Sequence, residues 1–254
     1  MYDPVQTLHQ IDAHKWPILV FCSLAMICNY AWFFSAYRQA NRDRTYSIPV
    51  FCSCFWLAGD GTVVLNFDRA FNTYDHWYPK LFWVALTVTV AFEIAFLVQT
   101  IRYGHKELLP EWTRPQFAAL VVGGAVVAAI LWGTIQSSFN DDLFIVYFHL
   151  ANVTMPIFYV GMLLRRRSTA GTNTFIWKAY LAMETLWYAA TFIWFGSDFR
   201  GIETVGCWVA TTVGCLGMIW ALGRLPRVAP HATEALVEPP QRVSTVGALT
   251  PGAS

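Results

Sequence analysis

The feature that most constrains this chain is a series of seven apolar segments, each about as long as a membrane is thick. Roughly 20 apolar residues in an α-helix cross the 30 Å hydrocarbon core of a bilayer. Such a segment must be helical, because a helix satisfies its backbone hydrogen bonds internally. The pattern predicts an all-α bundle of seven transmembrane helices. The segments lie near 16–37, 48–67, 79–102, 115–136, 143–164, 173–195 and 202–223.

The composition also indicates a membrane setting. Of the 254 residues, 56% are hydrophobic and only 13% are charged, whereas about 25% of the residues in soluble domains are charged. A water-soluble domain of this size could not bury so many apolar side chains. The formal net charge of +1 argues against nucleic acid as a partner.

The apolar segments divide the chain into three parts. We expect a polar N-terminal segment at 1–15, without a cleavable signal peptide, and a membrane domain at 16–223. The tail at 224–254 is rich in Pro, Ala and Thr, which is typical of disorder. No internal repeat is visible, so the inverted repeat of many transporters is not supported.

The basic residues predict the direction of the chain through the membrane. Thirteen of the 17 Lys and Arg residues lie in alternate connections, at 38–44, 102–114 and 165–178, and in the tail. Cytoplasmic loops carry an excess of Lys and Arg. We therefore expect the N-terminus outside and the C-terminus in the cytoplasm. The host membrane would be the endoplasmic reticulum in a fungus or the plasma membrane in a bacterium.

Three acidic residues lie well inside the apolar segments: Asp60, Glu93 and Glu184. With a rise of about 1.5 Å per residue, all three fall near the midplane of the bilayer. A charged acid there costs about 2.5–3.5 kcal/mol, so such residues normally face the bundle interior and mark function. Burial favours the neutral form of a carboxyl group, and a neutral carboxylic acid can donate a proton.

Other polar side chains lie at a similar depth. His149 and Asn152 are one turn apart in the fifth segment, and Asn29 lies in the first. This layer predicts a pocket inside the bundle. The alternative is that each acid is a neutral, hydrogen-bonded packing element.

Aromatic residues are abundant, with 12 Trp, 11 Tyr and 19 Phe. A ring face attracts a cation by about 0.5–2 kcal/mol. Mid-segment rings such as Trp56, Trp187 and Tyr188 could therefore line a pocket that stabilises a carbocation. The alternative is ordinary packing in the core or against lipid.

Motifs for several other reactions are missing. Residues 140–144 contain two acids but no DDxxD metal motif, and the paired cysteine spacing of a zinc site is absent. The last apolar segment has no lysine that could bind retinal. We therefore expect neither a metal nor a cofactor.

Several short strings resemble one known family when they are taken together. Their order and spacing over roughly residues 16–200 resemble the integral-membrane terpene cyclases of fungal and bacterial meroterpenoid and indole-terpenoid pathways. The strings are 44–49 (RTYSIP), 102–104 (RYG), Asn152 with Met155, Phe158, 161–164 (GMLL), the basic run 165–167, Gly171 and Lys178.

The resemblance implies metal-free cyclisation of a prenyl chain, often one with a terminal epoxide. An acid protonates the epoxide or alkene, cations migrate along the folded chain, and a base removes a proton. The family's acid in the second helix corresponds to Asp60 and its acid in the third to Glu93. The Trp that precedes the first acid is replaced by Gly59, and the acid of the seventh helix has no counterpart within 202–223 except Glu203 at its start.

We therefore predict a metal-independent terpene or meroterpenoid cyclase of the lyase or isomerase type. Its partner would be a hydrophobic prenylated small molecule that reaches the site from the bilayer between helices. The alternative is a non-enzymatic seven-helix carrier or sensor of small molecules. The predicted site residues are Asp60 as general acid, Glu93 to tune or re-protonate it, Glu184 or His149 as base, Asn152 to orient a substrate oxygen, Trp56, Trp187 and Tyr188 to stabilise cations, and Asn29 in the lining.

Overall fold

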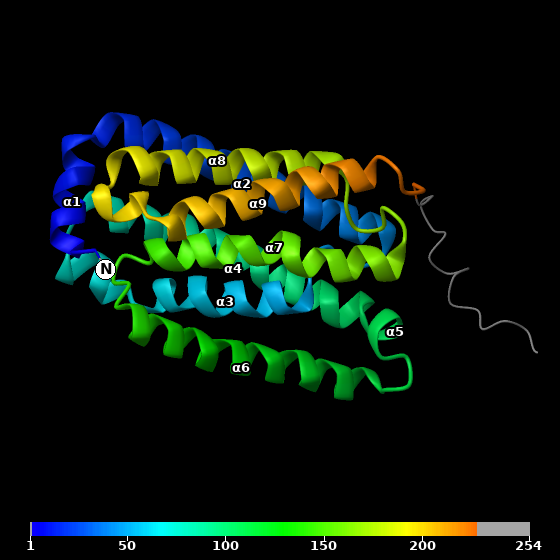
Figure 1. The fold of residues 1–254 in the computed structure, drawn as a ribbon. Helices are drawn as coiled ribbons and strands as arrows, with labels where there is room; N and C mark the ends of the chain where they lie inside the picture. Colours follow the sequence, from blue (N-terminus) through cyan, green and yellow to red (C-terminus); the bar gives the residue numbers. More distant parts are fainter. Residues whose placement is uncertain (1, 228–254) are drawn as a thin grey trace, which may run out of the picture.

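The computed structural model describes residues 2–227, and every regular element in this part of the chain is helical (Figure 1). The predicted disordered region falls largely at 228–254, outside the described residues. The elements are α1 (Pro4–Ala13), α2 (Lys15–Asp43), α3 (Val50–Leu65), the π-helical turn η1 (Arg69–Thr73), α4 (Trp77–Tyr103), α5 (His105–Leu108), α6 (Arg114–Phe139), α7 (Ile145–Arg166), α8 (Thr174–Trp194), the 3-10 turn η2 (Ser197–Arg200) and α9 (Ile202–Leu222).

The seven apolar segments coincide with α2, α3, α4, α6, α7, α8 and α9, so the all-α prediction is confirmed. These helices run in alternating directions along a common axis (Figure 1). Five of them, α2, α4, α6, α7 and α9, are long and apolar enough to cross a membrane. The chain therefore has the helices of a multi-pass membrane protein. Helix α3 is apolar but has only 16 residues.

The outer faces of the bundle are apolar, as a lipid environment requires. Val127 and Ile130 of α6 are 65% and 66% exposed. The bundle interior instead holds large rings: Trp32 of α2 makes an edge contact with Tyr180 of α8, with the ring centroids 5.1 Å apart. Helix α2 packs along α8, and α3 packs against both α4 and α6. The interior between the helices is therefore filled in part by large aromatic side chains.

The N-terminal segment is a helix with a buried face. Helix α1 begins after Asp3, whose side chain accepts a hydrogen bond from the backbone N–H of Gln6. Leu8 and Ile11 are buried. The helix lies across one end of the bundle, which we call the α1 end (Figure 1). Leu8 and Ile11 are three residues apart and therefore share one face of the helix. This spacing indicates an amphipathic helix, although the segment as a whole has a polar composition.

Asp141, in the connection before α7, binds the first turn of that helix. The Asp141 carboxylate accepts hydrogen bonds from the backbone N–H groups of Ile145 and Tyr147, at 3.0 and 2.7 Å. The hydroxyl of Tyr2 donates to the same carboxylate at 2.5 Å. Asp141 therefore caps the helix and ties it to the segment before α1.

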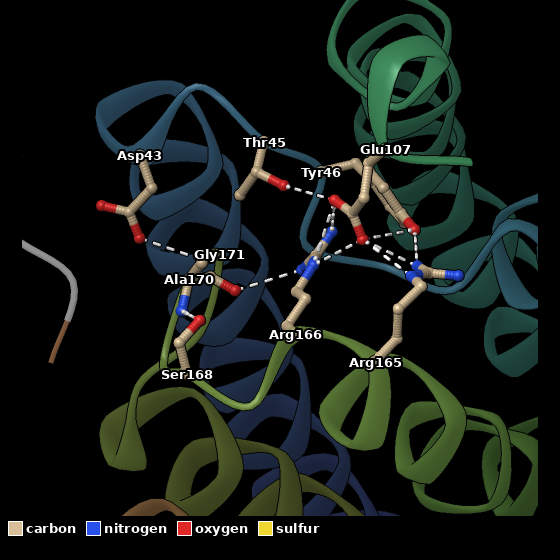
Figure 2. A network of polar contacts seen from close by, with 9 residues as sticks. All are labelled: Asp43, Thr45, Tyr46, Glu107, Arg165, Arg166, Ser168, Ala170 and Gly171. Atoms are coloured by element: carbon tan, nitrogen blue, oxygen red, sulfur yellow. Dashed lines mark hydrogen bonds and ion pairs between the residues drawn. The ribbon is translucent and has the colours of Figure 1, made fainter. Parts of the chain in front are cut away.

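The opposite end of the bundle is held by one carboxylate between two arginines (Figure 2). Glu107 Oε1 lies 2.8 Å from Nη2 of Arg165 and 3.0 Å from Nε of Arg166. The hydroxyls of Thr45 and Tyr46 each donate to Glu107 at 3.4 Å. This network joins α5, the connection between α2 and α3, and the end of α7.

Replacing Glu107 by Gln is expected to destabilise this end, because two guanidinium groups lose their charged partner. The free energy of unfolding should fall by about 2 kcal/mol, which corresponds to roughly 4–8 °C in melting temperature. Thermal unfolding in detergent, followed by tryptophan fluorescence, measures the loss. Glu111→Gln is the matched control, because Glu111 is exposed in the same connection.

The same pair predicts a dependence on pH. Burial alone would raise the pKa of Glu107, but the guanidinium groups of Arg166 and Arg165 outweigh it and lower this pKa below its ordinary value. The ionised form therefore stabilises the fold above the ordinary Glu range, about 4.3, and this contribution disappears as the pH falls through the lowered pKa. Glu107→Gln should flatten that part of the melting curve against pH, and an identical curve for the variant would contradict the assignment.

Candidate functional site

A small pocket lies in the middle of the bundle, enclosed by α2, α3, α4, α7 and α8. We call it the central pocket. Its volume is about 30 Å³, which is room for about one water molecule. The lining consists of Asn29, Trp32, Phe33, Trp56, Asp60, Thr89, Glu93, Tyr147, Phe148, Ala151, Asn152 and Met183.

Helical spacing brings the polar groups to one place. Trp56 and Asp60 are four residues apart on α3, and Thr89 and Glu93 are four residues apart on α4. Each pair therefore shares one face of its helix. Asp60 is 5% exposed and Glu93 is 1% exposed. The prediction that these two acids face the interior rather than lipid agrees with this burial.

The two carboxyl groups interact directly. The Asp60 and Glu93 side chains lie within interaction range of each other, and the Tyr147 hydroxyl lies close to Asp60. The same hydroxyl donates to the backbone oxygen of Trp56 at 3.3 Å. An ionised carboxylate can only accept a hydrogen bond, so a bond between two carboxyl groups requires a proton on one of them. Oxygen Oε2 of Glu93 is buried without a hydrogen bond.

Tyr147 reaches Asp60 because Gly59 leaves room for it. A Cβ atom at Gly59 would lie 1.9 Å from Cζ and from the hydroxyl oxygen of Tyr147. The ring therefore packs directly on the backbone of α3. The membrane terpene cyclases that the sequence strings resemble have a Trp at the position of Gly59. Here the Tyr147 ring from α7 occupies the space beside this position.

The indole N–H groups in the lining are already bonded. Trp56 donates to the backbone oxygen of Ala151 at 3.0 Å, and Trp32 donates to Oδ1 of Asn29 at 3.0 Å. The amide of Asn29 lies 3.5 Å from the Thr89 hydroxyl. These bonds hold the two indoles in place. The side chains in the lining that remain available to bind a ligand are those of Asp60, Glu93 and Asn152.

Glu184 lies outside the central pocket. It is completely buried, and neither carboxyl oxygen has a hydrogen bond. Its surroundings include Cys207 and Cys215, so it lies toward α9. Its neighbour Met183 lines the pocket instead. Glu184 therefore does not share a hollow with Asp60 and Glu93, contrary to what its depth in the sequence suggested.

Three other predicted residues also lie outside the pocket lining. The His149 ring stacks on Tyr188, with centroids 4.4 Å apart, and the Tyr188 hydroxyl donates to the His149 backbone oxygen. Trp187 packs against Phe82 and Phe148. These three side chains therefore form packing between α7, α8 and α4, and none of them contacts the acid pair.

Sequence reasoning missed Tyr147 and Trp32 as site residues. Trp32 is three residues after Asn29, and Tyr147 is four residues before Ala151, so each shares a helical face with a lining residue. That spacing was available in the sequence. The proximity of Tyr147 to Gly59 was not, because it depends on how α7 packs against α3.

Comparison with models of known protein families, with curated proteins and with solved structures finds no match to this chain. The resemblance to membrane terpene cyclases therefore rests on the sequence strings alone. Three of these strings meet at the end of the bundle opposite α1 (Figure 2). They contain Tyr46, the two arginines that bind Glu107, and Gly171, whose φ of 75° favours glycine and whose N–H donates to Asp43 at 2.9 Å.

Metal ligands are not grouped in the described part of the chain. Within residues 2–227, no three His, Cys, Asp or Glu side chains are arranged so that they could hold a metal ion. The central pocket contains only two such groups, Asp60 and Glu93. The lining also includes Tyr147, whose hydroxyl lies near Asp60.

Proposed function

We propose that the chain spans the membrane seven times, with the α1 end outside and the C-terminus in the cytoplasm. Two observations support the count: α3 and α8 pack among the five longer helices, and the directions of all seven alternate. Helix α8 contains two charged residues, Lys178 and Glu184. Lys178 is exposed near the cytoplasmic start of α8, where its amine can extend to the interface. The excess of Arg at the end opposite α1 supports the orientation.

We infer that the central pocket performs acid-initiated cyclisation or isomerisation of a prenylated or epoxy-prenylated substrate. The observation that carries this proposal is the pair of buried carboxyl groups, Asp60 and Glu93, that face each other in one aromatic pocket. A carboxyl group that shares a proton with a second carboxyl group and is shielded from water is preorganised to donate that proton. The sequence strings of the membrane terpene cyclases agree with this chemistry.

The roles follow from the contacts. Asp60 donates the proton to the epoxide oxygen or alkene, and Glu93 re-supplies it. Protonation opens the C–O bond, an alkene of the same chain attacks the resulting carbocation, and a new C–C bond forms. A final C–H proton returns to the carboxylate pair, so substrate and product have the same atoms. The ring faces of Trp32 and Trp56 stabilise the cation, and burial protects it from water. Glu184 and His149 have no part in this scheme.

The small volume of the pocket favours a second candidate function. Room for about one water molecule does not admit a prenyl chain until side chains such as Phe148 and Met183 move. A carrier that binds and releases a proton or small molecule at the carboxyl pair would need less movement. The two functions differ in what they require, because a carrier couples its acids to flux across a membrane, whereas a cyclase turns over without any gradient.

Turnover in detergent, where no gradient exists, distinguishes a cyclase from a carrier. The purified chain is incubated with an epoxy-farnesylated phenolic acceptor, and the products are separated by chromatography with mass detection. A cyclase converts the substrate to a product of identical mass and different retention. Failure to convert prenylated and epoxy-prenylated acceptors, together with proton flux in vesicles that Asp60→Asn abolishes, would establish the carrier instead.

A further inference from the structure

A second hollow lies at the α1 end, beside the central pocket. We call it the α1-end hollow. It is formed by the end of α3, η1, the start of α4 and the connection before α7, and its volume is about 20 Å³. That is room for one water molecule or one ligand oxygen. Its polar lining residues are Asn66, Arg69, Tyr74, Tyr78 and Asp142, and Phe82 and Phe144 also line it.

The two hollows lie in series along the same helices. Val63 lines the α1-end hollow and Asp60 lines the central pocket, three residues or about 4.5 Å apart along α3. Their linings are in contact: Phe82 of the α1-end hollow packs on Phe148 of the central pocket, with centroids 5.0 Å apart. A long molecule that displaced this contact would extend from one hollow into the other.

Two side chains that line the α1-end hollow, Tyr78 and Arg69, each carry a buried donor that makes no hydrogen bond. Tyr78 is 4% exposed, and its hydroxyl has no hydrogen bond. Nη1 of Arg69 is buried without a hydrogen bond and pairs with Asp142 only across 3.4 Å. Tyr74 donates to the other Asp142 oxygen at 2.9 Å, so that carboxylate is fixed. A buried donor without an acceptor is costly, and a ligand oxygen would satisfy both.

The charges around the hollow select a neutral ligand. Arg69 is balanced by Asp142, and Asp141 lies behind Tyr78 with its hydrogen bonds to Tyr2 and α7. The one arginine is therefore already balanced by one carboxylate, and a second carboxylate lies near Tyr78. A phosphate or carboxylate would be repelled, whereas a carbonyl, ether or hydroxyl oxygen would accept from Tyr78 and Arg69 without that penalty.

We propose that the α1-end hollow binds an uncharged oxygen on the polar head of a prenylated molecule, with Tyr78 and Arg69 as donors, while its chain extends past Phe82 to Asp60. This inference rests on the proposed function, since it assigns the substrate's head group. The head itself lies at the open edge, beside the exposed side chain of Asn66, and inserts a single oxygen. The site thereby sets which end of the substrate reaches the acid.

Competition binding tests the proposal independently of turnover. The full-length protein in detergent is loaded with radiolabelled geranylgeranyl benzoquinone, which carries a neutral oxygen head. It is then displaced by the unlabelled quinone, by geranylgeranyl diphosphate or by the headless hydrocarbon. We expect the quinone to compete about tenfold better than the hydrocarbon and better than the diphosphate. Tyr78→Phe and Arg69→Gln should each reduce that preference about threefold.

The controls separate this inference from the proposed function. Tyr159→Phe removes the hydroxyl of another buried tyrosine, outside both hollows, and should leave the preference unchanged. Asp60→Asn should also leave it unchanged, so a failure of the acid chemistry would not be mistaken for a failure of head binding. The inference is overturned if no probe binds, if the hydrocarbon or the diphosphate competes as well as the quinone, or if Tyr78→Phe keeps the full preference.

Discussion

Asp60→Asn is expected to lower turnover of the epoxy-prenylated substrate at least about 100-fold, because positioned general acids contribute roughly 10²–10⁴ to rate. The amide keeps the size of the side chain and removes its transferable proton. Asp60→Glu should retain part of the activity, with a loss of about tenfold or more, since an extra methylene displaces the donor by over 1 Å. Initial rates of product formation in detergent measure both changes.

Glu184→Gln is the matched control for this result. Glu184 is as deeply buried as the acid pair and lies at a similar depth in the bundle, but it is outside the central pocket. The turnover of the Glu184→Gln variant should stay within about twofold of that of the parent protein, because a group that does not reach the substrate supplies no transition-state interaction. Near-parental rates for Asp60→Asn, or a large loss for Glu184→Gln, would move the acid chemistry away from the pair of Asp60 and Glu93.

Gly59→Ala is expected to damage both stability and activity through Tyr147. A Cβ atom at this position would overlap the tyrosine ring at 1.9 Å, and both are fixed in helices. Overpacking of this kind costs about 1–3 kcal/mol. Displacing the hydroxyl from Asp60 by about 1 Å should lower turnover by up to roughly 100-fold. Thermal melting and initial rates report the two effects separately.

The neighbouring glycine supplies the control. A Cβ at Gly61 meets nothing within 4 Å, so Gly61→Ala should raise stability by up to about 1 kcal/mol through helix propensity and leave turnover unchanged. Combining Gly59→Ala with Tyr147→Leu should recover the melting temperature but not the rate, because the clash is gone and the hydroxyl is too. Equal melting temperatures for Gly59→Ala and Gly61→Ala would contradict the close contact.

Some of the site was open to prediction from the sequence. Asp60 and Glu93 could be found because a carboxyl group in an apolar helix must be turned away from lipid. Their four-residue spacing from Trp56 and Thr89 also placed those pairs on shared faces. Depth along a helix follows directly from residue number, so the common level of Asp60, Glu93 and Glu184 was computable. The direction in which each side chain points around its helix was not.

That difference separates Glu184 from the other two acids. All three lie at one level, but α8 is rotated so that Glu184 lies toward α9 and Met183 lies toward the pocket. The rotation of a helix about its axis is set by packing against several neighbours at once. The same holds for Tyr147, whose place depends on the missing side chain of Gly59 and on the Asp141 cap that starts α7.

The sequence by itself determined the number, length and helical nature of the apolar segments, because backbone groups in an apolar solvent must bond within their own helix. It also determined which polar residues would lie inside apolar segments, where their burial costs free energy. Only the tertiary structure decided that two of the three acids meet, and that a tyrosine joins them. It also decided that a second hollow lies nearer the α1 end. Those outcomes depend on side-chain contacts between helices, which no single segment encodes.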